Sequence, residues 1–408
     1  MKKKNSCFEN TFLIILTIIM LVYFGHNNIA VNLPMYSMPV YQIFILILTA
    51  ICGLKIIREK KIRIINKKYL AWLSTFIFMT IISIVWAIDS KYTYSAIMFI
   101  MFNFLMFFDI LIYCDEENKV YNIIKIYLVA MIYMCIRLIL FEDGRPGSMY
   151  FGNIVGLYFN NIAIALAFGI ALSLLLYFKN KKIIYILPIL LFYYIIYLTG
   201  SRKGLLLPIV FFIIFYFLNN RTSIKKYINF LVIIMIGISI IYVILKNNET
   251  LSLRMAELFE SFAGKEVSDY SVNERSFFRS TAMKLFLENP IIGIGINNFA
   301  AYMEQIGYSH VAYSHCNYTE ILSNLGIIGF GIYYYIYGYI VVKSIKLLKK
   351  YKEGKPELYY PIALIFVLLI FEYGFVSYYI FEAQIQIFIC YLLISFQMTR
   401  KEENNEQY

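Results

Sequence analysis

Long apolar runs recur along almost the whole chain, separated by short polar segments. Many are close to the roughly 20 residues that a helix needs to cross a bilayer core about 30 Å thick. The pattern predicts an all-α polytopic membrane protein with about 12 transmembrane helices. We expect these helices at 10–26, 38–57, 69–88, 94–114, 121–141, 154–178, 183–199, 203–219, 227–246, 319–343, 358–378 and 380–398.

Composition supports the membrane class and fixes the expected orientation. Of the 408 residues 61% are hydrophobic and 15% are charged, whereas about a quarter of a soluble domain is charged. The net charge of +12 would suit a nucleic acid partner. However, most basic residues fall in alternate loops, which are cytoplasmic if the N-terminus is inside. We therefore expect both termini in the cytoplasm and no nucleic acid partner.

The longest polar interval, 247–318, is predicted to face outward. Helical character over 271–288 ends at Asn289-Pro290, and a second short helix is expected over 298–306. The interval is then a helical extracytoplasmic cap between the ninth and tenth spans. Three parts follow: spans one to nine in 1–246, the cap loop in 247–318, and spans ten to twelve with a cytoplasmic tail in 319–408.

His315 is the candidate catalytic base. It is one of three histidines and lies just before the tenth span. Asn317 followed by Glu320 is typical of a helix N-terminus, which predicts a helix that begins near Tyr318 with Asn317 as its N-cap. A neutral imidazole, with a reference pKa of about 6.5, is available as a base near neutral pH.

Other interpretations of this segment remain open. His315 can instead be a loop histidine bonded to a carboxylate or carbonyl group, and His310 is a rival base. Cys316 could form a nucleophile pair with His315, although adjacent residues of a helix do not face each other. The six cysteines show no paired spacing, so neither a disulfide framework nor a zinc site is predicted.

Four arginines are expected on the outer side, against the usual inward bias of basic residues. Arg145 follows span five, Arg202 lies between spans seven and eight, and Arg275 and Arg279 lie one helical turn apart in the cap. Planar guanidinium groups bind phosphate oxygens in bidentate fashion, so several near one helix N-terminus suit a pyrophosphate. Alternatively, each is solvated or paired with an acid, and the Arg202 segment is only a capped turn.

Further polar and aromatic groups extend the candidate site. Arg137, Glu372 and Glu382 fall in the outer halves of predicted spans, where charges usually pair or line a cavity. They hint at a polar chamber that opens outward. The outer tyrosines available to stack on sugars are Tyr302, Tyr308 and Tyr313.

Several segments resemble motifs of the O-antigen ligase and O-antigen polymerase (Wzy-type) superfamily. Glu288 to Phe299 reads ENPIIGIGINNF, and Ser314 to Gly329 reads SHCNYTEILSNLGIIG. The Thr199 to Gly204 turn, TGSRKG, resembles a second family element, and Arg145 with Asn160-Asn161 is weakly similar to a third. Cys316 separates His315 from Asn317, a form similar to capsule or exopolysaccharide polymerases rather than to lipid A-core ligases.

The resemblance implies a GT-C-like, metal-independent glycosyltransferase without a cofactor. It would join undecaprenyl-diphosphate-linked repeat units into surface polysaccharide at the outer face of a bacterial cytoplasmic (inner) membrane. His315 would be the catalytic base. Expected partners are lipid-linked glycans, membrane lipids, a chain-length regulator and a flippase. The resemblance assigns diphosphate binding to Arg202, Arg275, Arg279 and Arg145, and supporting roles to Asn317, Glu320 and Tyr313.

Two other functions are compatible with parts of this pattern. An O-antigen or protein glycan ligase uses the same lipid-linked donor with a different acceptor. A transporter of lipid-linked glycans should show repeat-related halves or interrupted helices near the midplane, and the sequence shows neither.

Overall fold

The computed structural model describes residues 2–32, 37–59, 66–144, 151–219, 270–308, 312–349 and 355–405, together with residue 246. Almost all described elements are helical. The helices are α1 (Lys2–Gly25), α2 (Val40–Glu59), α3 (Lys68–Ile82), η1 (Ser83–Trp86), α4 (Ser90–Tyr113), α5 (Glu117–Phe141), α6 (Phe159–Asn180), η2 (Ile183–Tyr185), α7 (Leu187–Thr199), α8 (Arg202–Asn219), α11 (Tyr270–Glu288), α12 (Asn298–Gln305), α13 (Asn317–Leu348), α14 (Pro356–Phe371), η3 (Ser377–Tyr379) and α15 (Phe381–Asn405).

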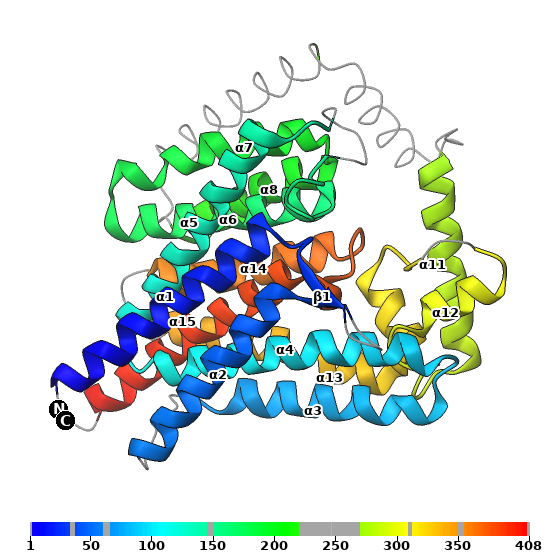
Figure 1. The fold of residues 1–408 in the computed structure, drawn as a ribbon, viewed down its shortest axis with the longest axis horizontal. Coiled ribbons are helices and arrows are strands. Elements are labelled where there is room, and N and C mark those ends of the chain that lie inside the picture. The colour runs from blue at the N-terminus through cyan, green and yellow to red at the C-terminus, as the bar shows by residue number, and fades with distance from the viewer. Residues whose placement is uncertain are drawn as a thin grey trace.

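One short ribbon interrupts the helical architecture. Strands β1 (Ala30–Asn32) and β2 (Ser37–Pro39) pair antiparallel, with Val31 opposite Met38. The sequence analysis did not predict this ribbon, because three-residue strands are too short to show an alternating pattern. It connects α1 to α2 (Figure 1).

Eight described helices are long and apolar enough to cross a membrane, which supports the predicted polytopic membrane class. Two shorter apolar helices cover Ile183–Thr199 and Pro356–Phe371. The predicted ninth span, 227–246, lies outside the described residues except for residue 246. Each of the other predicted spans overlaps a helix. The boundaries differ most at α1, which begins at Lys2 rather than at 10, at α14, which ends at Phe371 rather than at 378, and at α15, which ends at Asn405 rather than at 398.

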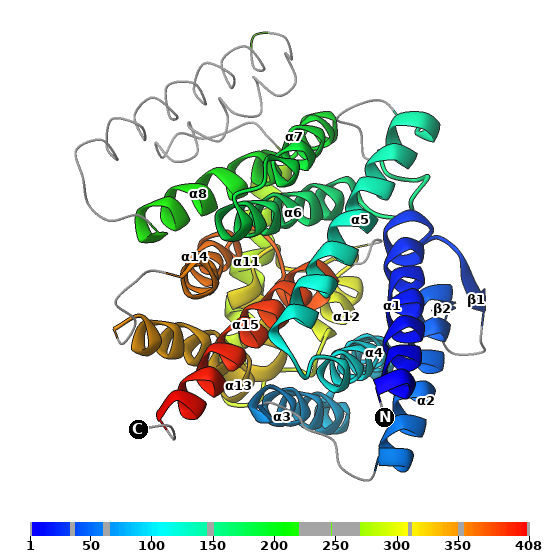
Figure 2. The same ribbon diagram turned by 90° about the vertical axis from the view of Figure 1, so that its left-hand side faces the viewer.

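Helix α15 forms the centre of the bundle. It packs against α5, α6, α13 and α14, and runs between them in Figures 1 and 2. Within its apolar window 94% of the residues are buried, because neighbouring helices pack around it, and the buried side chains include the polar Gln384 and Gln386. The surrounding helices therefore take their positions from a common central element.

The two ends of the bundle differ. The start of α1 and the end of α15 lie at one end, and α11 and α12 lie at the opposite end (Figure 1). Phe278, Leu285, Phe299 and Met303 form a separate small apolar core under α11 and α12. The helices expected for the cap are thus present at the end of the bundle that is remote from the chain termini.

Candidate active site

The α11–α12 loop is joined to α13 through backbone hydrogen bonds at a break in that helix. Gly326 has φ +62° and ψ −166°, so the regular helix stops there and resumes. The freed carbonyl groups of Ser323 and Asn324 accept hydrogen bonds from Ile294 and Gly295, at 3.0 and 2.9 Å. In return, Ile327 and Ile328 donate to the carbonyl groups of Pro290 and Ile291, at 2.9 and 3.3 Å. The two sequence motifs therefore form one structural unit.

Two glycines allow this close approach. A Cβ atom on Gly293 would lie 2.4 Å from the carbonyl carbon of Asn324, and one on Gly326 would lie 2.3 Å from that of Ile291. Both glycines also have positive φ angles. The interruption of α13 was not predicted, but its polar groups are satisfied by protein backbone. These four backbone groups are therefore already bonded, unlike the groups that bind substrates in the broken helices of transporters.

A chain of buried hydrogen bonds runs from the cap to the His315 segment. The Asn324 amide oxygen accepts from the N–H of Phe299 at 2.8 Å, and its nitrogen donates to Glu320 Oε1 at 3.0 Å. Glu320 Oε2 accepts from the N–H of Ser314 at 2.6 Å. Glu320 is 1% exposed, so it acts as an internal brace that fixes the segment next to His315.

The start of α13 corrects the predicted cap. Cys316 takes the extended N-cap position, α13 begins at Asn317, and no side chain caps the helix. The Asn317 amide nitrogen instead donates to the Tyr334 hydroxyl at 2.8 Å. Glu320, the acidic residue of the predicted helix-start signature, accepts from the N–H of Ser314, which lies before the expected N-cap Asn317. Cys316 is 1% exposed, which argues against its use as a nucleophile.

His315 lies between two aromatic rings in a strained backbone conformation. Its φ of +57° is in the left-handed region, which is uncommon for a residue with a Cβ atom. The imidazole is parallel to the Phe278 ring, with centroids 6.0 Å apart and an interplanar angle of 4°. Its centroid is 4.1 Å from that of Tyr313. The ring is half-buried, so it remains reachable.

The cap arginines lie on the helix that meets this imidazole. On α11, Arg275 lies three residues before Phe278 and four before Arg279, so the Arg275 side chain is a neighbour of both on the helix surface. Burial raises the pKa of the Tyr313 hydroxyl, and the positive charge of Arg275 opposes that shift. Arg275 therefore acts electrostatically on the residue that contacts His315.

The α7–α8 turn brings further positive charge to the same place. Arg202 is the first residue of α8, and Lys203 interacts electrostatically with Arg202, Arg275 and Arg279. The Lys203 ammonium group donates to the carbonyl of Gly374. The Arg279 guanidinium lies 4.9 Å from the centroid of Tyr373. Lys203 and Arg279 therefore contact the loop after α14. Burial, together with the charges of Arg275, Arg202 and Arg279, lowers the pKa of Lys203 to about 7.

Lys203 was not among the predicted site residues. Its position beside Arg202 in the TGSRKG turn was the available signal, because both residues occupy the first turn of the same helix. Its participation depends on the proximity of the 371–375 segment, which sequence spacing does not reveal.

Several predicted residues lie elsewhere. Arg145 and His310 are outside the described residues. The three intramembrane charges have different partners: Arg137 contacts His26, Glu372 accepts from Tyr334 and Tyr337, and Glu382 accepts from Tyr23. These partners give no support to one shared polar chamber.

Of the three candidate sugar-stacking tyrosines, only Tyr313 lies against His315. Tyr302 and Tyr308 pack against the core of the cap, and Tyr308 stacks on Phe277 with centroids 5.8 Å apart. These two tyrosines support the cap, whereas Tyr313 is 39% exposed beside the imidazole.

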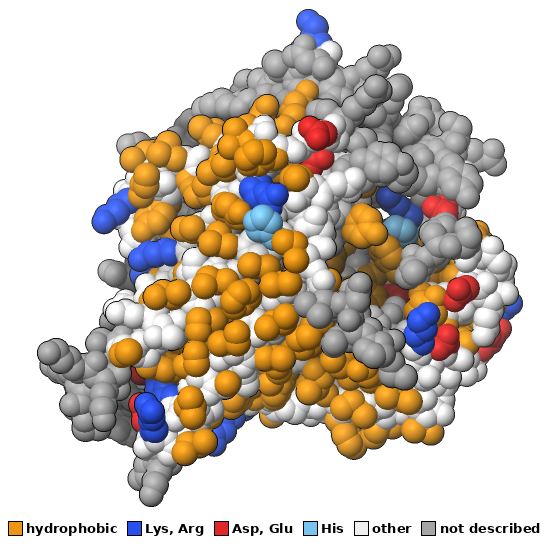
Figure 3. Space-filling model, in the orientation of Figure 1, with side chains coloured by type: hydrophobic (Ala, Val, Ile, Leu, Met, Phe, Trp, Pro, Cys, Tyr) orange, Lys and Arg blue, Asp and Glu red, His pale blue; other side chains and the backbone are white. Residues whose placement is uncertain are grey.

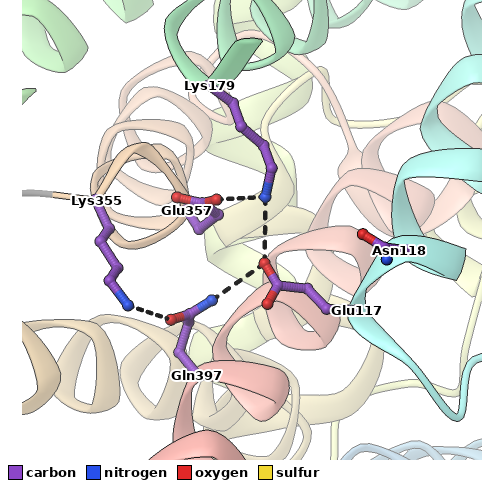
Figure 4. Close-up of a pocket in the computed structure, with 6 residues that line it drawn as sticks. All are labelled: Glu117, Asn118, Lys179, Lys355, Glu357 and Gln397. Atoms are coloured by element: carbon purple, nitrogen blue, oxygen red, sulfur yellow. Dashed lines mark hydrogen bonds and ion pairs between the residues drawn. The ribbon is translucent and has the colours of Figure 1, made fainter.

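A charged pocket of about 400 Å³ lies at ends of α5, α6, α14 and α15 (Figure 4). Lys179 Nζ is 2.6 Å from Glu357 Oε1 and 3.3 Å from Glu117 Oε1, while Lys355 and Gln397 complete the chain of contacts. Its charges largely satisfy one another and come from the helix ends that lie away from the cap. The contacts around the pocket connect the four helices, and the pocket is separate from the His315 site.

A half-buried imidazole and several basic side chains thus lie at one end of a polytopic helical membrane protein. Residues 187–334, from the start of α7 into α13, match the family model described as O-Antigen ligase. Over these residues the match confirms the predicted resemblance to the O-antigen ligase and O-antigen polymerase superfamily. Members of this family are glycosyltransferase-like enzymes. No curated protein sequence matches the chain.

The backbone interlock predicts that Gly326→Ala is strongly destabilising. The new methyl group meets the Ile291 carbonyl, and positive φ disfavours alanine, so we expect a loss of about 2 kcal/mol or more. Gly331→Ala is the matched control, because a Cβ at Gly331 in the same helix meets nothing within 4 Å. Thermal unfolding in detergent measures both. Equal stability of the two variants would contradict the interlock.

The buried brace predicts a defect in Glu320→Gln. The Glu320 carboxylate accepts from two donors, so a glutamine amide leaves one of them unpaired, at a cost of about 1–3 kcal/mol. We expect a lower turnover rate because the His315 segment shifts. Exposed Glu288, 3.9 Å from Lys284, provides the control Glu288→Gln. Unchanged stability and turnover in Glu320→Gln would exclude the bracing role.

Proposed function

We propose that the protein polymerises undecaprenyl-diphosphate-linked oligosaccharide units into surface polysaccharide. The convergence of the His315 segment, α11 and the start of α8 carries this proposal, because it joins a base to several cations. The family match over the same region supports glycosyl transfer. The predicted architecture belongs to the proposal: about 12 spans, a GT-C-like arrangement, and an extracytoplasmic cap in a bacterial cytoplasmic membrane.

In the proposed reaction His315 accepts the proton of an acceptor sugar hydroxyl. The resulting nucleophilic oxygen forms a bond to the anomeric carbon of the donor, and the bond from that carbon to the lipid diphosphate breaks. Base catalysis of this kind contributes about 10²–10⁴-fold. The flanking rings of Phe278 and Tyr313 restrict rotation of the imidazole, so it is held ready for the acceptor.

The cation cluster would stabilise the departing diphosphate. Arg202, Arg275 and Arg279 each disfavour the charged form of Lys203, and a bound diphosphate would offset that repulsion. Charge that is already oriented toward the leaving group stabilises the transition state without reorganisation. In our proposal these basic side chains take the place of a metal ion in neutralising the diphosphate.

The alternative is a ligase that transfers glycan from the same donor to a lipid or protein acceptor. The description of the matching family model favours it. The insertion of Cys316 between His315 and Asn317 favours the polymerase. Defined acceptors supplied to the purified protein separate the two: a polymerase extends lipid-linked units, and a ligase does not.

His315→Ala in the native host is expected to abolish long-chain surface polysaccharide. Single lipid-linked units should accumulate, because the donor is still made but the acceptor hydroxyl is not deprotonated. Electrophoresis of the polysaccharide and extraction of the lipid-linked units measure both effects at matched protein levels. Lys284→Ala, an exposed residue of α11, serves as the control. Normal chain length in His315→Ala would rule out the proposed base.

Arg202→Lys tests the role of the guanidinium fork. Lysine keeps the charge but not the bidentate geometry, so we expect transfer to slow by at least about tenfold. Initial rates with purified protein and a lipid-linked donor provide the measurement. Arg58→Lys, at the exposed end of α2, is the matched control. An unchanged rate in Arg202→Lys would remove this residue from the diphosphate site.

A further inference from the structure

A basic residue lies on an otherwise apolar face of the bundle. Val129, Ile136 and Leu140 of α5 are 53%, 46% and 64% exposed, so this side of the helix faces outward from the bundle. Arg137 follows Ile136 one helical turn before α5 ends at Phe141. Figure 3 shows a basic side chain beside a histidine within this broad apolar face.

The Arg137 side chain is held in place by neutral groups. Its Nη1 atom donates to the carbonyl of Gly25 at the end of α1 and lies 2.6 Å from Nδ1 of His26. The Tyr133 hydroxyl lies 2.9 Å from Nε2 of the same imidazole. Burial and the Arg137 charge lower the pKa of His26, so the ring is neutral at neutral pH. These contacts orient the guanidinium but do not compensate its charge.

No carboxylate neutralises Arg137 within the part of the chain that the structure describes. None of the ion pairs there includes it. Glu142, the acidic residue that follows α5, accepts instead from the backbone N–H groups of Gly144, Gly152 and Ile154, at 2.9, 3.0 and 3.4 Å. A guanidinium group in an apolar, membrane-facing surface is costly without an anion.

We infer that Arg137, oriented by His26 and Tyr133, binds the phosphate of an anionic phospholipid. Its place one turn from the helix end is where headgroup phosphates meet the hydrocarbon boundary. The exposed side chains of Val129, Ile136 and Leu140 continue along α5 as a surface for an acyl chain. The guanidinium has five N–H donors, and its contacts with Gly25 and His26 involve Nη1 alone, so Nη2 and Nε can donate to phosphate oxygens.

A purely structural role would be to cap the carbonyl groups at the end of α1. That role accounts for the Gly25 contact, but it does not require a guanidinium on the lipid-facing surface. The two roles differ in their consequence for lipid selectivity. A cap affects stability alone, whereas a phosphate site also enriches anionic lipid around the protein.

The test measures lipids retained by the purified full-length protein. Wild type and Arg137→Gln are placed in nanodiscs with equal amounts of phosphatidylglycerol and phosphatidylcholine, extracted gently, and examined by native mass spectrometry. We expect wild type to retain more phosphatidylglycerol than phosphatidylcholine. In Arg137→Gln the ratio of the two retained lipids should fall by about tenfold. Arg58→Gln, an exposed arginine at the end of α2, should retain it.

Equal enrichment in wild type and Arg137→Gln would overturn the inference and leave Arg137 as a helix cap. Equal loss in Arg137→Gln and Arg58→Gln would also overturn it, because the attraction would then be non-specific. Displacement of the lipid by millimolar inorganic phosphate would identify free phosphate as the ligand and contradict the lipid assignment. If Arg137→Gln does not fold, Arg137→Lys replaces it, with a loss of enrichment expected because the fork is absent.

Discussion

The backbone interlock between the Pro290–Gly295 segment and the break in α13 is the constraint on which the rest of the site depends. Each partner supplies the hydrogen bonds that the other lacks, so neither segment is satisfied alone. The interlock fixes where α11 stands relative to the start of α13. It therefore sets the distance between the helix that carries Arg275 and Arg279 and the segment that carries His315.

Polar side chains extend this constraint to the His315 segment. Asn324 connects the start of α12 to Glu320, and Glu320 connects α13 to Ser314, which precedes His315. A buried network of this kind is rigid because every broken bond leaves a desolvated polar group. This rigid network can hold His315 at its positive φ angle, a conformation that would otherwise relax. Such a fixed backbone also limits the orientations of the imidazole.

The sequence predicted the class of the fold because apolar run length is a direct physical requirement of the bilayer. It also predicted the helices at 271–288 and 298–306, since Asn289-Pro290 ends α11 as expected. It did not predict the break at Gly326, because a glycine within an apolar helix is compatible with both a regular and an interrupted backbone. The roles of Asn317 and Lys203 were likewise inaccessible, because their partners, Tyr334 and Gly374, are distant in sequence.

The central claim is that the His315 imidazole takes a proton during transfer from a lipid diphosphate. Chemical rescue tests it most directly: purified His315→Gly is assayed for diphosphate lipid release with a defined donor and acceptor, with and without added imidazole. If His315 is the base, His315→Gly shows little activity without imidazole and a concentration-dependent return of transfer when imidazole is added. Transfer by His315→Gly at the wild-type rate without imidazole would show that His315 is not the base.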